Sequence, residues 1–134
     1  MMLHWAKRGI ALAVLIGCAL AGMTWVAIDA GANEAREARE IVLVAREMAF
    51  FVQGDAAANP TLLVRPGERI RIVLRNEEPG VTHNFAVPGW DVATRELYGT
   101  GTDAVEFIVP PSPGRQEYQC APHATMMRGA IEVR

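Results

Sequence analysis

Apolar and polar residues alternate with a period of two over most of the chain after residue 40. Between Arg69 and Arg75, isoleucine and leucine occupy every second position, so one face of the segment is apolar and arginines line the other. The same alternation recurs at 104–109 and 131–134. A period of two is typical of half-buried β-strands. Strands are therefore expected to build the region 41–134.

Residues that favour turns separate these segments. They are Asn59-Pro60, Arg65-Pro66-Gly67, Glu78-Pro79-Gly80, Pro88-Gly89, Gly99-Thr100-Gly101 and Pro110 to Gly114. Short strands divided by such turns, with no convincing helical pattern after residue 40, predict an all-β domain built as an antiparallel β-sandwich. The length of 41–134 is sufficient for one such domain with a modest core.

The chain begins with a different pattern. Residues 9–28 contain no charged side chain, and at about 1.5 Å per residue a helix of this length spans a hydrocarbon core of about 30 Å. Lys7 and Arg8 precede the segment and Asp29 follows it. By the positive-inside rule, the N-terminus stays in the cytoplasm and the domain lies on the periplasmic, extracytoplasmic side. Residues 1–28 are therefore predicted to be a membrane anchor or signal segment.

Three fates of this segment stay open. Retention as a transmembrane helix is favoured, because the apolar run exceeds the roughly 7 to 15 residues of a cleaved signal. Cleavage after Ala32 or lipidation at Cys18 would instead give a secreted or lipid-anchored protein. Under each of the three, Cys18 is unavailable for a disulfide with Cys120. Residues 29–40, which alternate acids with arginines, are interpreted as a solvated, charged linker.

Charge and composition restrict the function. Thirteen lysines and arginines against fifteen acids give a formal charge of -2, so no basic field is available to bind nucleic acid. The chain has two cysteines and three histidines. Because Cys18 and His4 belong to the N-terminal segment, the domain keeps Cys120, His83 and His123. These three side chains and the methionines near them are the candidates for chemistry.

Strand alternation places two of these side chains inside the domain. His83 shares a strand face with the apolar Phe85, and Cys120 shares one with Tyr118. His123 follows three residues after Cys120, in the turn before the last strand. The thiol and the imidazoles are therefore expected at strand ends and in one short turn.

One thiolate, two imidazoles and a thioether form a soft, mixed ligand set. Two histidines and a cysteine with a distant methionine are typical of a blue-copper electron-transfer site. A structural zinc site usually takes four cysteine or histidine ligands, and a dinuclear copper centre needs a second cysteine where Ala124 stands. Catalysis by the Cys120 thiol needs an accessible sulfur and a substrate pocket, whereas the Cys120 side chain is predicted to face inward. Each residue alone is explained by core packing, but their joint placement favours one mononuclear copper site and no enzyme activity.

Several motifs of the domain are shared with one family. They are Asn59-Pro60, Pro66-Gly67, His83-Asn84, Tyr118-Gln119-Cys120-Ala121-Pro122-His123 and Met127-Arg128-Gly129. Together they resemble the cupredoxins, especially the plastocyanin, amicyanin and azurin branch, over residues 41–134. The resemblance implies a Greek-key β-sandwich with one copper ion held at one pole by His83, Cys120, His123 and a methionine. It also implies that Asn84 ties the His83 loop to the ligand loop.

The sequence leaves two details of this site open. Met126 has the methionine spacing of amicyanin, whereas Met127 has that of azurin and keeps the following basic residue and glycine in register. Met127 is therefore favoured as the axial ligand, with Met126 as the alternative. Ala121 stands where these proteins often have serine or threonine, so one hydrogen bond between the loops is expected to be missing.

The predicted function is that of a membrane-tethered, extracytoplasmic type 1 copper protein. It would carry single electrons between a redox protein donor and acceptor, such as a cytochrome or a membrane redox complex, with no small-molecule substrate. The alternative is a copper delivery or sequestration module, or an accessory subunit of a membrane oxidase-type complex. In the resembling family an apolar patch docks redox partners. The corresponding residues here would be Pro88, Trp90, Pro122, Ala124 and Met126.

Overall fold

The computed structural model describes residues 37–134. The predicted membrane segment at 9–28, the alternatives at Cys18 and Ala32, and most of the linker 29–40 lie outside the described residues. No helix within 37–134 is long and apolar enough to cross a membrane.

Strands dominate the described chain, and only two single-turn 3-10 helices interrupt them. The elements are β1 (Arg39–Arg46), β2 (Ala49–Val52), β3 (Thr61–Val64), β4 (Arg69–Asn76), β5 (Thr82–His83), β6 (Ala86–Val87), η1 (Pro88–Trp90), β7 (Val92–Ala93), β8 (Leu97–Tyr98), β9 (Gly101–Ile108), β10 (Gly114–Gln119), η2 (Ala121–His123) and β11 (Arg128–Val133). The prediction of an all-β domain is confirmed.

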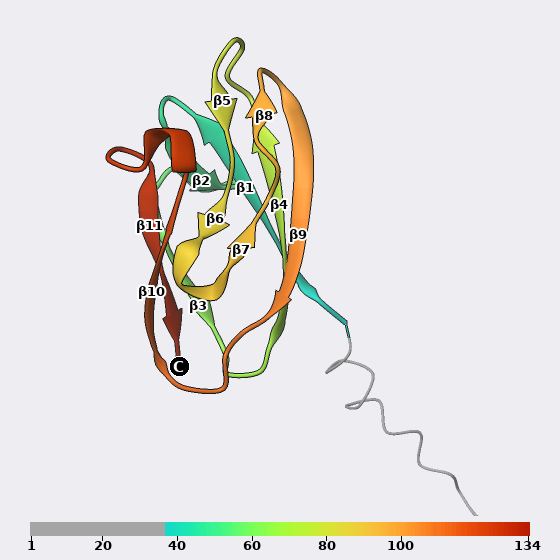
Figure 1. Ribbon diagram of the computed structural model, residues 1–134, viewed down its shortest axis with the longest axis vertical. Coiled ribbons are helices and arrows are strands. Elements are labelled where there is room, and N and C mark those ends of the chain that lie inside the picture. Colours follow the sequence, from blue (N-terminus) through green and yellow to red (C-terminus); the bar gives the residue numbers. More distant parts are fainter. Residues whose placement is uncertain (1–36) are drawn as a thin grey trace, which may run out of the picture.

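Two sheets form the layers of a sandwich (Figure 1). One sheet has the strand order β2-β1-β4-β9, the other has β3-β11-β10-β6-β7, and β5 pairs with β8 in a short separate ladder. Two neighbouring pairs are parallel, β1 with β4 and β3 with β11. The prediction of an antiparallel sandwich is therefore wrong for these two pairs, whereas the other strand pairs are antiparallel. Side-chain alternation reports which face of a strand is buried, but not the direction of its neighbour.

The parallel pairs arise because the chain changes sheets. After the β1–β2 hairpin, β3 joins the opposite sheet, and β4 then returns to lie beside β1. A connection of this length allows a parallel return, which a tight hairpin does not. Strand β1 begins at Arg39, two residues before the predicted domain boundary. Glu40 lies opposite Arg71 in the ladder and forms an ion pair with it, so these two linker residues belong to the sheet.

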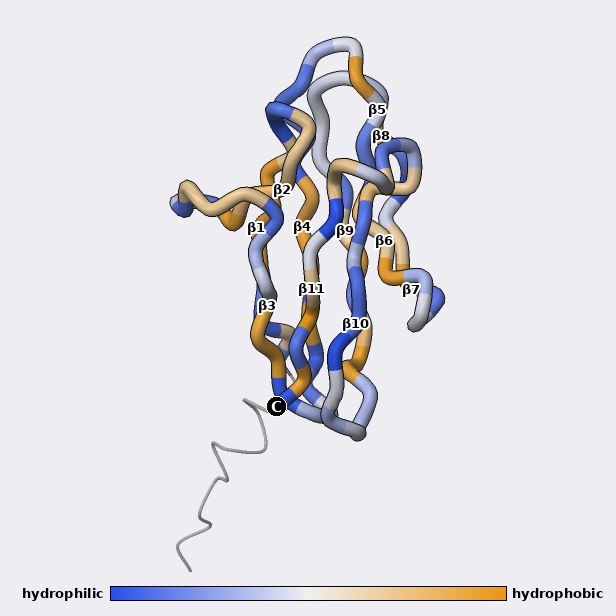
Figure 2. The backbone as a smooth tube through the Cα atoms, turned by 90° about the vertical axis from the view of Figure 1, so that its left-hand side faces the viewer, coloured by the Kyte–Doolittle hydropathy of each residue, from blue (hydrophilic) through white to orange (hydrophobic). Residues whose placement is uncertain are grey.

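The core lies between the two sheets, where the sequence pattern predicts it. Ile70, Ile72 and Leu74 of β4 are fully buried, and the arginines between and beside them are not. Figure 2 shows hydrophobic segments along the strands and hydrophilic ones at many of the loops. Phe85 and Tyr118 stack with ring centroids 5.4 Å apart in the middle of this core. They support the strands that lead to the candidate site.

The two ends of the sandwich have different roles. The beginning of β1 and the C-terminus lie at one end, whereas η2 and β5 lie toward the other (Figure 1). At the first end the Arg134 N–H donates to the carbonyl of Val64, and Arg39 forms an ion pair with Glu68. Eight residues of β1 separate this end from the other, or roughly 25 Å at 3.3 Å per residue.

Candidate metal centre

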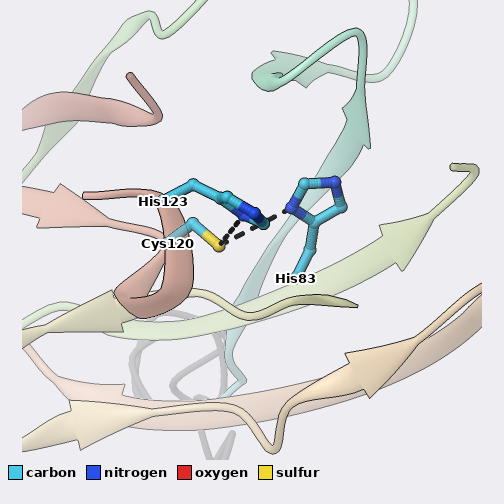
Figure 3. Close-up of side chains that lie close together, drawn as sticks. All are labelled: His83, Cys120 and His123. Atoms are coloured by element: carbon cyan, nitrogen blue, oxygen red, sulfur yellow. Dashed lines mark hydrogen bonds between the residues drawn. The ribbon is translucent and has the colours of Figure 1, made fainter. Parts of the chain in front are cut away.

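Three side chains from different parts of the sequence converge at one end of the sandwich. The ligand atoms of His83, Cys120 and His123 all lie within 4.8 Å of one another. The Cys120 Sγ is 3.6 Å from the Nδ1 of His83 and 3.6 Å from the Nδ1 of His123. Figure 3 shows both rings turned toward the sulfur. Among residues 37–134, this is the group of histidine, cysteine and acidic side chains that could hold a metal ion.

Backbone hydrogen bonds fix the loop that carries two of these ligands. The Cys120 N–H donates to the Met127 carbonyl at 2.9 Å, so the loop is closed at its base. Inside it, the His123 N–H donates to the Cys120 carbonyl at 3.0 Å, and the Met127 N–H donates to the His123 carbonyl at 2.9 Å. Pro122 lies in the first turn of η2, where its missing N–H costs no hydrogen bond. These three hydrogen bonds make the loop compact and set the spacing of Cys120 and His123 within it.

Burial separates the three ligands into an inner pair and an outer one. His83 and Cys120 are fully buried, whereas His123 is half-buried at the surface. Burial raises the pKa of the Cys120 thiol, although hydrogen bonds from the backbone of Asn84 and His123 work in the other direction. The raised pKa disfavours the thiolate that binds metal ions. A bound metal ion would deprotonate the coordinating thiol despite its burial.

The two methionines occupy opposite environments. Met127 is fully buried and belongs to the same apolar cluster as Cys120. Met126 is 57% exposed at the surface of the loop. Of the two thioethers, Met127 therefore has the burial expected of an axial ligand, and Met126 is available for contacts with another molecule.

Asn84 connects the loop of His83 to the ligand loop. Its Oδ1 accepts a hydrogen bond of 2.7 Å from the backbone N–H of Ala121. The residue after the cysteine thus contributes through its backbone, which every residue type except proline can do. A hydroxyl at position 121 could only add a further bond to this one. The link expected between Asn84 and this loop is present.

Sequence reasoning missed an acidic side chain behind His83. The Nε2 of His83 lies 2.8 Å from Oε2 of Glu78, which also accepts a hydrogen bond of 3.3 Å from the Met48 N–H. Burial works to raise the pKa of Glu78, but these hydrogen bonds outweigh it and the pKa lies below its usual value. In the sequence, Glu78-Pro79-Gly80 indicates a turn shortly before His83, but a turn motif does not show that the Glu78 carboxylate points toward the histidine.

Solved structures of similar shape share this architecture, although no protein-family model and no curated protein matches the sequence. One is auracyanin A, described as a "blue" copper protein from the green thermophilic photosynthetic bacterium Chloroflexus aurantiacus. It matches at a TM-score of 0.60 and 19% identity, over 73% of this chain and 100% of that one. The domain has a cupredoxin fold.

Two further solved structures widen the comparison. Reduced rusticyanin matches at a TM-score of 0.51 and 21% identity, over 71% of this chain and 78% of that chain. A chain of a heme-copper terminal oxidase dimer matches at a TM-score of 0.57 and 17% identity, over 71% of this chain and 63% of its own length. The cupredoxin fold therefore occurs both in small copper proteins and within a chain of a larger assembly.

Two hydrogen bonds outside the predicted site hold the ligand loop onto the cupredoxin core. Asn59 has a positive φ of 50°, which asparagine tolerates, and its Nδ2 donates to the Met126 carbonyl at 3.2 Å. The Tyr118 hydroxyl donates to the carbonyl of Pro60 at 2.7 Å. The Asn59-Pro60 motif is thus bonded both to the ligand loop and to β10, the strand that leads into that loop.

Two residues of the predicted apolar patch, Pro88 and Trp90, do not lie beside the ligand loop. Trp90 packs against Phe107 with ring centroids 5.8 Å apart and shares its surroundings with Val133, at the end of the cupredoxin domain away from η2. Strand β6 carries the chain away from the His83 loop, so η1 begins five residues, or roughly 16 Å of extended chain, after His83. Pro88 and Trp90 therefore do not belong to a surface patch around the ligand loop.

Proposed function

We propose that this chain is a mononuclear type 1 copper protein that carries single electrons. Cys120, His83 and His123 would bind the ion, and Met127 would be its weak axial ligand. The observation that carries the proposal is the convergence of one sulfur and two Nδ1 atoms in a buried site. When bound there, copper supplies a one-electron couple between Cu(I) and Cu(II). The donor set suits it, because thiolate and thioether favour Cu(I) and imidazole suits Cu(II) as well.

The role of the protein is to keep the ligands in one geometry in both oxidation states. His83 and Cys120 are fully buried, and the hydrogen bond from Ala121 to Asn84 joins their loops. A site held in this way changes little when the charge of the ion changes, which lowers the reorganisation on electron transfer. A fixed scaffold is the form of support that functional sites require.

Electrons would enter and leave through the half-buried His123. Pro122 and Met126 are exposed beside it, and Ala124 is half-buried. These apolar side chains form the surface at which a redox protein, such as a cytochrome or a membrane redox complex, would bring its own centre close. Transfer of an electron through His123 needs such a contact surface and no substrate cavity. The protein is therefore proposed as a carrier rather than an enzyme.

We also propose that residues 9–28 hold the domain at the extracytoplasmic face of the cytoplasmic membrane. Strand β1 begins at the end of the sandwich away from η2, so a tether at that end would leave the ligand loop facing away from the lipid. This orientation suits exchange of electrons with partners in the periplasm or with the projecting part of a membrane complex.

Copper binding and voltammetry test the proposed function together. The full chain, loaded with copper, should bind one ion per molecule, show a reversible one-electron wave and retain its copper against a moderate chelator. Rapid loss of copper to the chelator without a reversible wave would instead indicate delivery or sequestration. One similar solved structure is a chain of a heme-copper oxidase, so a third outcome is also tested. Co-purification of the protein with an oxidase complex would indicate an accessory subunit.

A further inference from the structure

A carboxylate contacts the side of His83 that faces away from the sulfur. The Nδ1 of this ring lies 3.6 Å from the Cys120 Sγ, while its Nε2 lies 2.8 Å from the Glu78 Oε2. The His83 side chain is fully buried, and that of Glu78 keeps 23% of its surface exposed. The imidazole therefore bridges the candidate metal centre and a side chain that reaches the surface.

The chemistry of this contact determines which nitrogen can bind a metal ion. An ionised carboxylate only accepts hydrogen bonds, so the Nε2 of His83 must carry the proton in its contact with Glu78. In the neutral ring, Nδ1 then has a free lone pair directed toward Cys120. Glu78 thus selects the tautomer that the metal centre needs. Carboxylate, imidazole and metal ion arranged in this way are a known means of orienting a histidine ligand.

The Glu78 side chain is held in place by the turn that carries it. Pro79 and Gly80 occupy the centre of the turn, where the positive φ of Gly80, 75°, suits a type II turn, and the Val81 N–H donates to the Glu78 carbonyl at 3.3 Å. The Glu78 N–H donates to Oδ1 of Asn76 at 2.9 Å.

A buried asparagine anchors that turn in the domain. Asn76 is 1% exposed, and its Nδ2 donates to the carbonyls of Val81 and Leu97 at 2.9 and 3.0 Å. The Met48 N–H, in the β1–β2 turn, donates to the same Glu78 carboxylate oxygen that contacts His83. Two separate loops therefore fix the position of the Glu78 carboxylate.

We propose that Glu78 is a positioning residue of the metal centre, which holds His83 in the metal-binding tautomer and stabilises the more highly charged state of the bound ion. The inference rests on the proposed copper function. Its electrostatic part follows from charge, because a carboxylate one imidazole away from the ion favours Cu(II) over Cu(I). Loss of such a partner typically weakens metal binding by about 10-fold to 100-fold.

The test compares two single-charge variants of the full chain. In Glu78→Gln, the amide oxygen can still accept from His83 and Met48, so the contacts persist while the charge is lost. In the matched control Glu77→Gln, a neighbouring carboxylate that pairs with Arg75 and does not contact His83 is neutralised instead. We expect Glu78→Gln to weaken Cu(II) binding about tenfold relative to Cu(I), which raises the one-electron potential by about 59 mV. Glu77→Gln should shift the potential by less than a third of this.

A second measurement needs no copper. The nitrogen chemical shifts of His83 in the metal-free chain, measured by NMR, should show the proton on Nε2 in the wild type and a mixture of tautomers in Glu78→Ala. A wild-type ring protonated on Nδ1, or equal potential shifts in Glu78→Gln and Glu77→Gln, would overturn the inference. A wild-type chain that binds no copper would overturn the proposed function, and the NMR result would then decide the role of Glu78 alone.

Discussion

Gly129 should be among the least replaceable residues of the domain, because an aromatic ring lies where its side chain would be. It is paired with Tyr118 across the ladder between β10 and β11. A Cβ atom at this position would lie 2.7 Å from Cε1 of Tyr118 and closer still to Cζ and the hydroxyl. The ring cannot move aside easily, since it is fully buried and stacks on Phe85, and its hydroxyl donates to the carbonyl of Pro60.

The cost of Gly129→Ala can be worked from these contacts. Forcing an extra methyl group into a packed core costs about 1–3 kcal/mol, and losing the Tyr118 hydrogen bond adds about 1 kcal/mol. Replacing glycine by alanine returns about 0.4–1 kcal/mol by restricting the unfolded chain. We therefore expect a net loss of about 2 kcal/mol, which lowers the Tm by about 8–16 °C in a domain of this size.

Thermal unfolding of the full chain, followed by circular dichroism, is the assay. Gly101→Ala is the matched control, because Gly101 also lies in a strand and the nearest atom to its added Cβ, Leu97 Cδ2, is 4.0 Å away. The control should melt at the wild-type temperature or slightly above it. If Gly129→Ala melted together with Gly101→Ala, the close packing of Tyr118 on Gly129 would be refuted.

Further predictions concern the ligands and acid stability. Met127→Leu should raise the reduction potential by removing the axial donor, whereas Met126→Leu should leave it unchanged; voltammetry showing the reverse would exchange their roles. Asn84→Ala should accelerate copper loss to a chelator, because the hydrogen bond to the ligand loop is lost, and an unchanged rate would contradict this role. The hydrogen bond from Arg39 lowers the pKa of Glu68. The ionised Glu68 carboxylate therefore stabilises the folded chain above the unfolded-state pKa of about 4.3, and this stabilisation is lost as pH falls through the lower folded-state pKa. Urea unfolding should show that Glu68→Gln destabilises the chain at pH 7 but not at pH 2; a constant difference would be contrary evidence.

The strand content and the buried face of β4 follow from alternation alone, because a sandwich buries every second side chain. The burial of His83 and of Cys120 follows similarly, since each was predicted to share a strand face with core residues. The parallel pairing of β1 with β4 does not follow, because it depends on which sheet the intervening strand joins. The resemblance of the motifs supplied what alternation cannot, namely the meeting of the two loops at one end.

Two features of the site's surroundings could not be predicted from local pattern. Glu78 reaches His83 only because a turn folds back between β4 and β5, and a glutamate in a turn is ordinarily exposed to solvent. The resemblance to the cupredoxins predicts Trp90 in the apolar patch near the ligand loop. The extended chain through β6 carries it away instead, because each residue of a strand advances the chain by about 3.3 Å.

The absorption and electron paramagnetic resonance spectra of the Cu(II)-loaded full chain test the central claim most directly. A type 1 centre at His83, Cys120 and His123 predicts intense visible absorption from sulfur-to-copper charge transfer, with the narrow copper hyperfine splitting of a thiolate-bound ion. Cys120→Ser should abolish both signals while the fold persists. A colourless wild-type protein, or a coloured Cys120→Ser variant, would contradict the claim that these residues form a copper electron-transfer site.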